Sequence, residues 1–141
     1  MIITRTAKQE LLIEAALSGK YKFILYGGAI RGAKTFGMLL TFLIAKIKYH
    51  RMRGVFARKD IPTIERNTYP TWEKFSPNSV FDDKRRDNKN PRIIFKNKAE
   101  LIFFGENFDR DKELNRWKGL ETNWFLADEI NEMQEVSFWK M

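Results

Sequence analysis

The sequence contains no cysteine and only one histidine, His50. These absences exclude a disulfide framework, a cysteine-ligated zinc site and a histidine-based metal centre. Long apolar runs are also missing: the longest, residues 36–45, is about ten residues, whereas a helix that spans a bilayer needs roughly 20. Residues 1–9 are polar and do not contain the apolar segment of a signal peptide. We therefore expect a cytosolic protein.

What the chain has in abundance is positive charge. Its 141 residues, the length of one domain, include 26 lysines and arginines against 18 acids, a net charge of +8. With 43% hydrophobic residues it can still build a core. The charge favours a polyanionic partner, although a solvated basic surface explains it equally well. The same two interpretations, a DNA phosphate contact or a solvated loop, apply to the basic cluster Lys84, Arg85, Arg86, Lys89, Arg92, Lys96 and Lys98.

One stretch, residues 22–35, combines an apolar run with a glycine-rich loop. The run 23–26 predicts a short buried strand, two glycines follow it, and a helical pattern begins at Lys34 and Thr35. This order is typical of a phosphate-binding loop, in which backbone N–H groups and a helix N-terminus face an anion. The simpler alternative is a glycine turn with an incidental lysine. The predicted loop residues are Gly27, Gly28, Ala29, Ile30, Arg31, Gly32, Ala33, Lys34 and Thr35.

The spacing of this loop departs from the usual pattern at one residue. Counting from Gly28 puts Ala33 where the second glycine belongs. This register keeps the spacing to the Lys-Thr pair, whereas counting from Gly27 makes Ala33 an insertion, so we prefer the first. If position 33 requires a positive φ, the alanine costs roughly 1–2 kcal/mol.

A second motif lies near the end of the sequence. The apolar residues 124–127 predict a buried strand, and Asp128 and Glu129 follow it directly. Ligands of open α/β sheets bind at the carboxyl edge of the strands. There Asp128 and the Thr35 hydroxyl can hold Mg²⁺, and Glu129 can act as general base toward water. Alternatively, Asp128 is only the N-cap of the next helix. Together the two motifs predict a site for ATP and Mg²⁺.

The remaining pattern predicts an α/β domain. Thr6 can cap a first helix over residues 5–19, and Pro70 is expected to interrupt a helix over 60–75. Taken by itself, Gln9 of the first helix is most simply interpreted as a solvated surface residue. The expected apolar face of that helix is Leu11, Leu12, Ala15 and Ala16. Further predicted elements are a helix over 34–49, strands over 55–57 and 123–127, a hairpin of 92–96 with 100–104, and a helix over 132–140.

Several short stretches carry a family resemblance. Besides Tyr-Gly-Gly-Ala-Ile-Arg-Gly-Ala-Lys-Thr at 26–35, they are Thr-Ala-Lys-Gln at 6–9, Ala-Arg-Lys at 57–59, Trp-Lys-Gly-Leu-Glu at 117–121 and Phe-Leu-Ala-Asp-Glu-Ile at 125–130. On these motifs, nearly the whole chain resembles the N-terminal part of the ATPase domain of tailed-phage terminase large subunits, the DNA-packaging motors. The resemblance implies a P-loop NTPase fold of the ASCE type, with a mainly parallel sheet flanked by helices.

The resemblance also implies roles for individual residues. Gln9 matches the glutamine that recognises adenine, and Arg31 matches a loop arginine that stabilises charge on the γ-phosphate. Lys34 matches the phosphate-binding lysine. Thr35 and Asp128 match the magnesium ligands, and Glu129 matches the catalytic glutamate.

Motors of this family also use an arginine from a neighbouring subunit. Arg116 is our first candidate for this catalytic arginine, and Arg58 is the second. For either residue the alternative is a surface arginine that pairs with an acid.

The resemblance further implies parts that residues 1–141 do not contain. Intact motors have a strand between the two motif strands, which carries the residue that couples hydrolysis to movement, and a C-terminal nuclease domain. Only 12 residues, 130–141, follow Glu129. We therefore expect a C-terminally truncated, partial ATPase domain that hydrolyses ATP slowly or not at all.

The implied partners are double-stranded DNA, the portal, the small terminase subunit and further copies of the chain in a ring. The implied location is the cytoplasm of an infected bacterial cell. The residues themselves leave two alternatives open. One is another nucleic-acid-dependent P-loop ATPase of the helicase kind, and the other is a non-enzymatic, basic nucleic-acid-binding fragment.

Overall fold

The computed structural model describes residues 3–27, 33–75, 85–87 and 91–138. Its strands are β1 (Arg53–Arg58), β2 (Arg85–Asp87), β3 (Arg92–Ile94), β4 (Glu100–Gly105) and β5 (Trp124–Ala127). Its α-helices are α1 (Ala7–Leu17), α2 (Lys34–Lys48), α3 (Ile61–Thr63), α4 (Tyr69–Phe75) and α6 (Glu135–Phe138). A π-helix, η1 (Ile64–Thr68), and two 3₁₀ turns, η2 (Asn115–Trp117) and η3 (Ile130–Glu132), complete the described elements. No described helix is long and apolar enough to cross a membrane.

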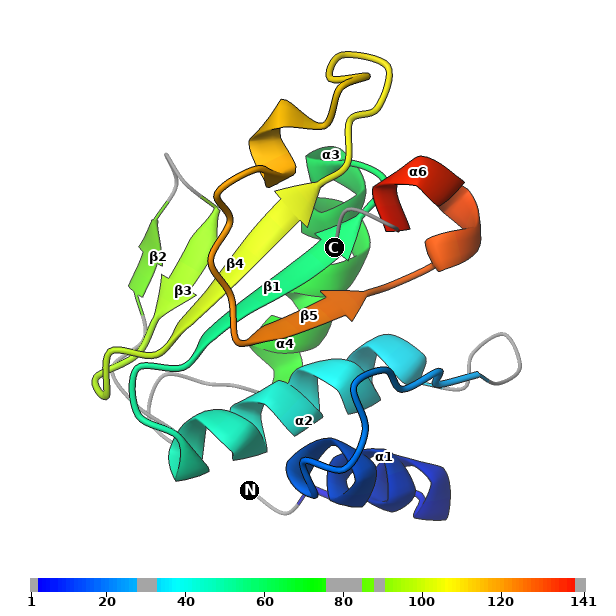
Figure 1. The fold of residues 1–141 in the computed structure, drawn as a ribbon. Coiled ribbons are helices and arrows are strands. Elements are labelled where there is room, and N and C mark those ends of the chain that lie inside the picture. The colour runs from blue at the N-terminus through cyan, green and yellow to red at the C-terminus, as the bar shows by residue number, and fades with distance from the viewer. Residues whose placement is uncertain (1–2, 28–32, 76–84, 88–90, 139–141) are drawn as a thin grey trace.

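The strands form one mixed sheet in the order β2-β3-β4-β1-β5. β1 lies between β4 and β5 and pairs with both in parallel, whereas β3 is antiparallel to β2 and to β4. Four of the five strands therefore run in the same direction (Figure 1). The predicted α/β class is confirmed, as are the central strand, the hairpin of β3 with β4 and the last strand.

The two faces of the sheet are covered in different ways. On one face, Phe56 of β1 packs in a core with α2, η1 and α4. Helix α2 approaches β1 closely because position 54 is glycine: a Cβ there would lie 2.3 Å from the Phe42 ring. On the other face, the segment between β4 and β5 folds back over the sheet, and the Trp117 ring stacks on Phe125 at 5.4 Å. Because both faces are covered, Val55, Phe56 and Ala57 are fully buried.

Helix α1 begins as predicted, but its buried face is shifted: Leu12, Ala15 and Ala16 are only partly buried. The Thr6 hydroxyl accepts a hydrogen bond from Gln9 N, and Thr6 N donates to Gln9 Oε1, a complete capping box. Leu11, expected on the apolar face, is 64% exposed, and the buried residues are Gln9 and Ile13. Gln9 is therefore not the solvated surface residue of the simpler interpretation.

The helical segment after β1 contains no break at Pro70. Pro70 is the second residue of α4, and the irregular turn lies before it, in the π-helix η1. The widened turn is closed by a hydrogen bond from Tyr69 N to Ile64 O. The next residue is Pro70, which has no N–H to donate. Ile64 and Trp72 of this segment are buried, and Ile61 is partly buried.

The segment 23–26 is not the buried strand that the sequence predicts. It has no strand assignment, and Phe23 and Leu25 are 75% and 92% exposed. Tyr26 is partly buried and packs on α2, where a Cβ at Gly37 would lie 3.3 Å from its ring. An apolar run becomes a strand only when another strand accepts its backbone hydrogen bonds. None of the described strands pairs with residues 23–26. At the edge of the sheet formed by β5, this strand pairs only with β1.

The exposure of residues 23–26 predicts unequal effects of two leucine-to-alanine substitutions. Leu25→Ala should change the free energy of unfolding by less than about 0.5 kcal/mol, because Leu25 is exposed. Leu39→Ala should cost about 2–5 kcal/mol, because Leu39 is fully buried in α2. Urea unfolding followed by tryptophan fluorescence measures both. Equal losses would show that residues 23–26 are buried after all.

Candidate active site

One hydrogen bond joins the two sequence motifs. The Thr35 hydroxyl, in the first turn of α2, donates to Asp128 Oδ2 at 2.8 Å, across 93 residues of sequence. Asp128 directly follows β5, and its backbone N–H donates to Ala57 O at 3.0 Å. The parallel pairing of β1 with β5 thus delivers Asp128 to the carboxyl edge of the sheet, where α2 begins.

Asp128 is a buried carboxyl group, and the effect of its burial is partly offset by a hydrogen bond and by a nearby cation. The residue is only 2% exposed, and this burial raises its pKa above the ordinary value of 3.8. The Thr35 hydrogen bond and the Arg58 guanidinium act in the opposite direction, whereas neighbouring Glu129 adds to the increase in pKa. Arg58 Nη1 lies 3.7 Å from Asp128 Oδ2.

The donor set at this edge is suited to a magnesium ion. Thr35 and Asp128 offer a hydroxyl and a carboxylate oxygen in mutual contact, and Mg²⁺ prefers oxygen ligands. Within the described residues, no group of three or more His, Cys, Asp or Glu side chains gathers to hold a metal. The protein would therefore supply few ligands, as is usual for Mg²⁺ that is also held by water and substrate phosphate.

The described end of the glycine loop has a strained backbone. Ala33 is the N-cap of α2 and adopts φ 51° and ψ 35°, the left-handed conformation that disfavours alanine. Its carbonyl oxygen accepts a hydrogen bond from Gln9 Nε2 at 3.5 Å, so α1 contacts the loop directly. Lys34 is the first residue of α2. Gly27 is exposed, and the remaining predicted loop residues, Gly28, Ala29, Ile30, Arg31 and Gly32, lie outside the described residues.

Glu129 is a second residue with a left-handed backbone at this edge, with φ 51° and ψ 52°. It is the N-cap of η3 but makes no side-chain cap hydrogen bond, and Asp128 is bonded to Thr35 instead. The alternative in which Asp128 merely caps the next helix is therefore not observed. Ala33 and Glu129, two of the six described non-glycine residues with positive φ, thus lie close in sequence to Thr35 and Asp128, and strain of this kind is tolerated where the surrounding structure holds it.

The structure places the two candidate arginines in different surroundings. Arg116 is exposed, and its guanidinium lies 4.9 Å above the Phe104 ring, in the segment that covers the second face of the sheet. Arg58 is the last residue of β1, and its side chain is only 11% exposed, between Asp128 and Glu132. The sequence names Arg58 only as the second candidate for an arginine that acts on a neighbouring subunit, and not as a residue of the site in its own chain. The signal was available, because the carboxyl ends of neighbouring parallel strands lie side by side.

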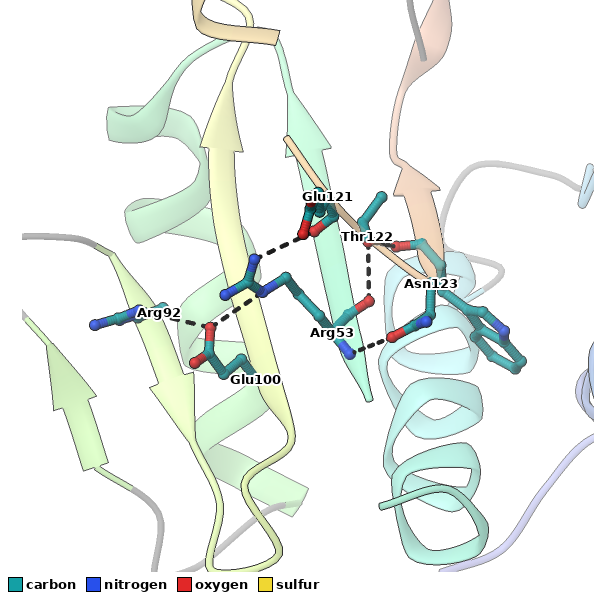
Figure 2. Close-up of polar contacts among 7 residues, drawn as sticks. Arg53, Arg92, Glu100, Glu121, Thr122 and Asn123 are labelled. Atoms are coloured by element: carbon teal, nitrogen blue, oxygen red, sulfur yellow. Dashed lines mark hydrogen bonds and ion pairs between the residues drawn. The ribbon is translucent and has the colours of Figure 1, made fainter. Parts of the chain in front are cut away.

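A polar cleft of about 450 Å³ lies at the opposite edge of the sheet, where β1, β4 and β5 begin (Figure 2). Arg53 Nε and Arg92 Nη1 each lie 3.5 Å from Glu100 Oε2, and Asn123 Oδ1 accepts from Arg53 N. Arg92 of the predicted basic cluster thus takes part in an internal ion pair. Lys98, another member, is exposed and lines the cleft.

The chain was compared with known proteins. No protein-family model matches it, and no curated protein or solved structure is significantly similar. The case for a function therefore comes from the residues and from the geometry of this site.

The strain at Ala33 predicts a stabilising substitution. Ala33→Gly should raise the free energy of unfolding by up to about 1 kcal/mol, because relief of the left-handed strain exceeds the added flexibility of the unfolded chain. Ala45→Gly, within α2 and fully buried, should instead destabilise by about 1 kcal/mol or more. Urea denaturation compares the two variants, and a loss at position 33 equal to that at position 45 would contradict the strain.

The raised pKa of Asp128 predicts how stability depends on pH. Between 3.8 and the raised pKa, the folded state binds more protons than the unfolded state, so this residue lowers stability as pH rises. The stability of Asp128→Asn relative to wild type should therefore increase from pH 3.5 to pH 7.

Asp60 provides a control, because its contribution to stability should change with pH in the opposite direction. The pKa of Asp60 is lowered by its hydrogen bond with Thr63, so it contributes stability that is lost as pH falls. Asp60→Asn should therefore lose stability relative to wild type as pH rises through this acidic range. Denaturant titrations at each pH measure both differences, and the same sign for the two variants would contradict the assignment.

Proposed function

We propose that this chain is a P-loop ATPase segment that binds ATP with Mg²⁺ where α2 begins and β5 ends. The observation that carries the proposal is the 2.8 Å hydrogen bond from Thr35 to Asp128. The predicted hydroxyl and carboxylate ligands come from motifs that are far apart in sequence, and a glycine turn with an unrelated acidic pair would not require this contact.

Each described residue of the site has a chemical part in this proposal. Lys34 and the backbone N–H groups in the first turn of α2 neutralise phosphate charge, since a helix N-terminus attracts anions. Thr35 and Asp128 hold the metal, which when bound offsets charge on the phosphates. Glu129, on a half-exposed turn beside Asp128, orients and deprotonates the attacking water. Arg31 supplies a further positive charge, as the resemblance implies.

The biological setting that we propose is DNA packaging by a terminase large subunit. It is supported by the resemblance and by the net charge of +8, which is suited to a DNA partner. In a ring of such subunits, Arg116 is the candidate for the catalytic arginine given to a neighbour, because its side chain is on the surface. The portal and the small terminase subunit are further partners that the resemblance implies.

A non-enzymatic nucleic-acid-binding module is the second candidate. Arg51 and Lys98 favour it, because both are exposed cations at the cleft where β1 and β4 begin. A helicase-like ATPase would share the Thr35–Asp128 site, and only the family resemblance argues against it.

Nucleotide binding tests the proposal directly. Lys34→Ala should weaken binding of a fluorescent ATP analogue in the presence of Mg²⁺ by at least about tenfold, because a phosphate-facing charge is lost. Glu129→Gln should retain binding and abolish any hydrolysis. Lys20→Ala is the control, since Lys20 is exposed between α1 and the loop. Wild type that binds DNA in a salt-sensitive manner but no nucleotide would establish the binding module instead.

A further inference from the structure

Arg58 lies between two carboxylates of its own chain. Its Nη1 is 3.7 Å from Asp128 Oδ2, and its Nε is 3.7 Å from Glu132 Oε2. Both distances exceed that of a hydrogen bond, and Nε is buried without a hydrogen-bond partner among the described residues. A buried guanidinium that forms two loose ion pairs can exchange one partner for the other at little cost.

The two partners of Arg58 differ in their surroundings. Asp128 is almost fully buried and is fixed by Thr35, whereas the Glu132 side chain is 41% exposed and belongs to η3. η3 begins immediately after Glu129, and Glu132 N donates to Glu129 O at 2.8 Å. A movement of Arg58 toward Glu132 would therefore act on the turn that carries the proposed catalytic carboxylate.

Asp128 Oδ2 is also the oxygen that the proposed metal site requires, since Thr35 donates to it. Arg58 and a divalent cation would lie close to each other at this oxygen, where two positive charges repel. They therefore compete for it.

We propose that Arg58 is a positioning residue that holds Asp128 when no metal is bound and pairs with Glu132 when Mg²⁺ and nucleotide bind. Arg58 thereby couples occupancy of the site to the position of Glu129. This inference rests on the proposed function, and it assigns Arg58 to the site of its own chain and not to that of a neighbour.

The test is the Mg²⁺ concentration that gives half-maximal binding of a fluorescent, non-hydrolysable ATP analogue to the full chain. Arg58→Gln should lower this midpoint by roughly tenfold, because the competing cation is removed. Arg58→Lys should keep it near the wild-type value. Glu132→Gln should raise the midpoint several-fold, because Arg58 then has only Asp128 to pair with. Arg53→Gln, at the opposite edge of the sheet, is the control and should change nothing.

The double variant Arg58→Gln/Glu132→Gln sharpens the test. It should behave like Arg58→Gln alone, since Glu132 acts on the metal only through Arg58. A merely structural role for Arg58 would raise the midpoint or leave it unchanged, and either result would overturn the inference. If Arg58→Gln does not fold, a midpoint that fails to rise in Glu132→Gln overturns it equally.

The same titration separates this inference from the function on which it rests. Wild type that binds no analogue at any Mg²⁺ concentration would overturn the proposed function and the inference with it. Wild type that binds the analogue, with a midpoint unaffected by Arg58→Gln, would overturn the role of Arg58 alone.

Discussion

The contact between the Thr35 hydroxyl and the Asp128 carboxylate is the constraint on which the candidate site depends. It requires that α2 begin where β5 ends, and two features of the fold meet this requirement. β5 is fixed by its parallel register with β1, in which Ala57 lies opposite Ala127. α2 is fixed by packing on the same strand, where Gly54 makes room for the Phe42 ring. A shift in either element would separate the two oxygens, so the packing of the core also determines the geometry of the site.

The elements that the sequence predicts well are those whose pattern is local. α2 is apolar on most sides, β1 and β5 are short apolar runs, and the turn between β3 and β4 contains Asn97 and Lys98. The segment 23–26 has an equally apolar pattern, yet Leu25 is almost fully exposed. The two segments differ in their neighbours, because β5 pairs with β1, whereas no described strand lies beside residues 23–26. The apolar pattern of a segment predicts which side chains it can bury, but not whether a partner strand lies beside it.

The site could be predicted in part for the same reason. Lys34, Thr35, Asp128 and Glu129 follow from motif spacing and from the rule that ligands bind at the carboxyl ends of strands. The burial of Gln9 and Arg58 does not follow from the local pattern, because polar residues are expected on the surface and only tertiary packing buries them. Both had an indirect signal. Thr6 and Gln9 have the spacing of a capping box, and Arg58 ends the strand that pairs with β5.

Among the described strands β5 ends the sheet, and this position bears on how the chain behaves in solution. A sheet edge that no described strand covers, together with the exposed side chains of Phe23 and Leu25, favours association between copies. The net charge of +8 opposes such association through repulsion over a Debye length of about 10 Å at 0.1 M salt. Added salt shortens that range while it strengthens apolar contacts. We therefore expect self-association of the chain to increase as the salt concentration rises.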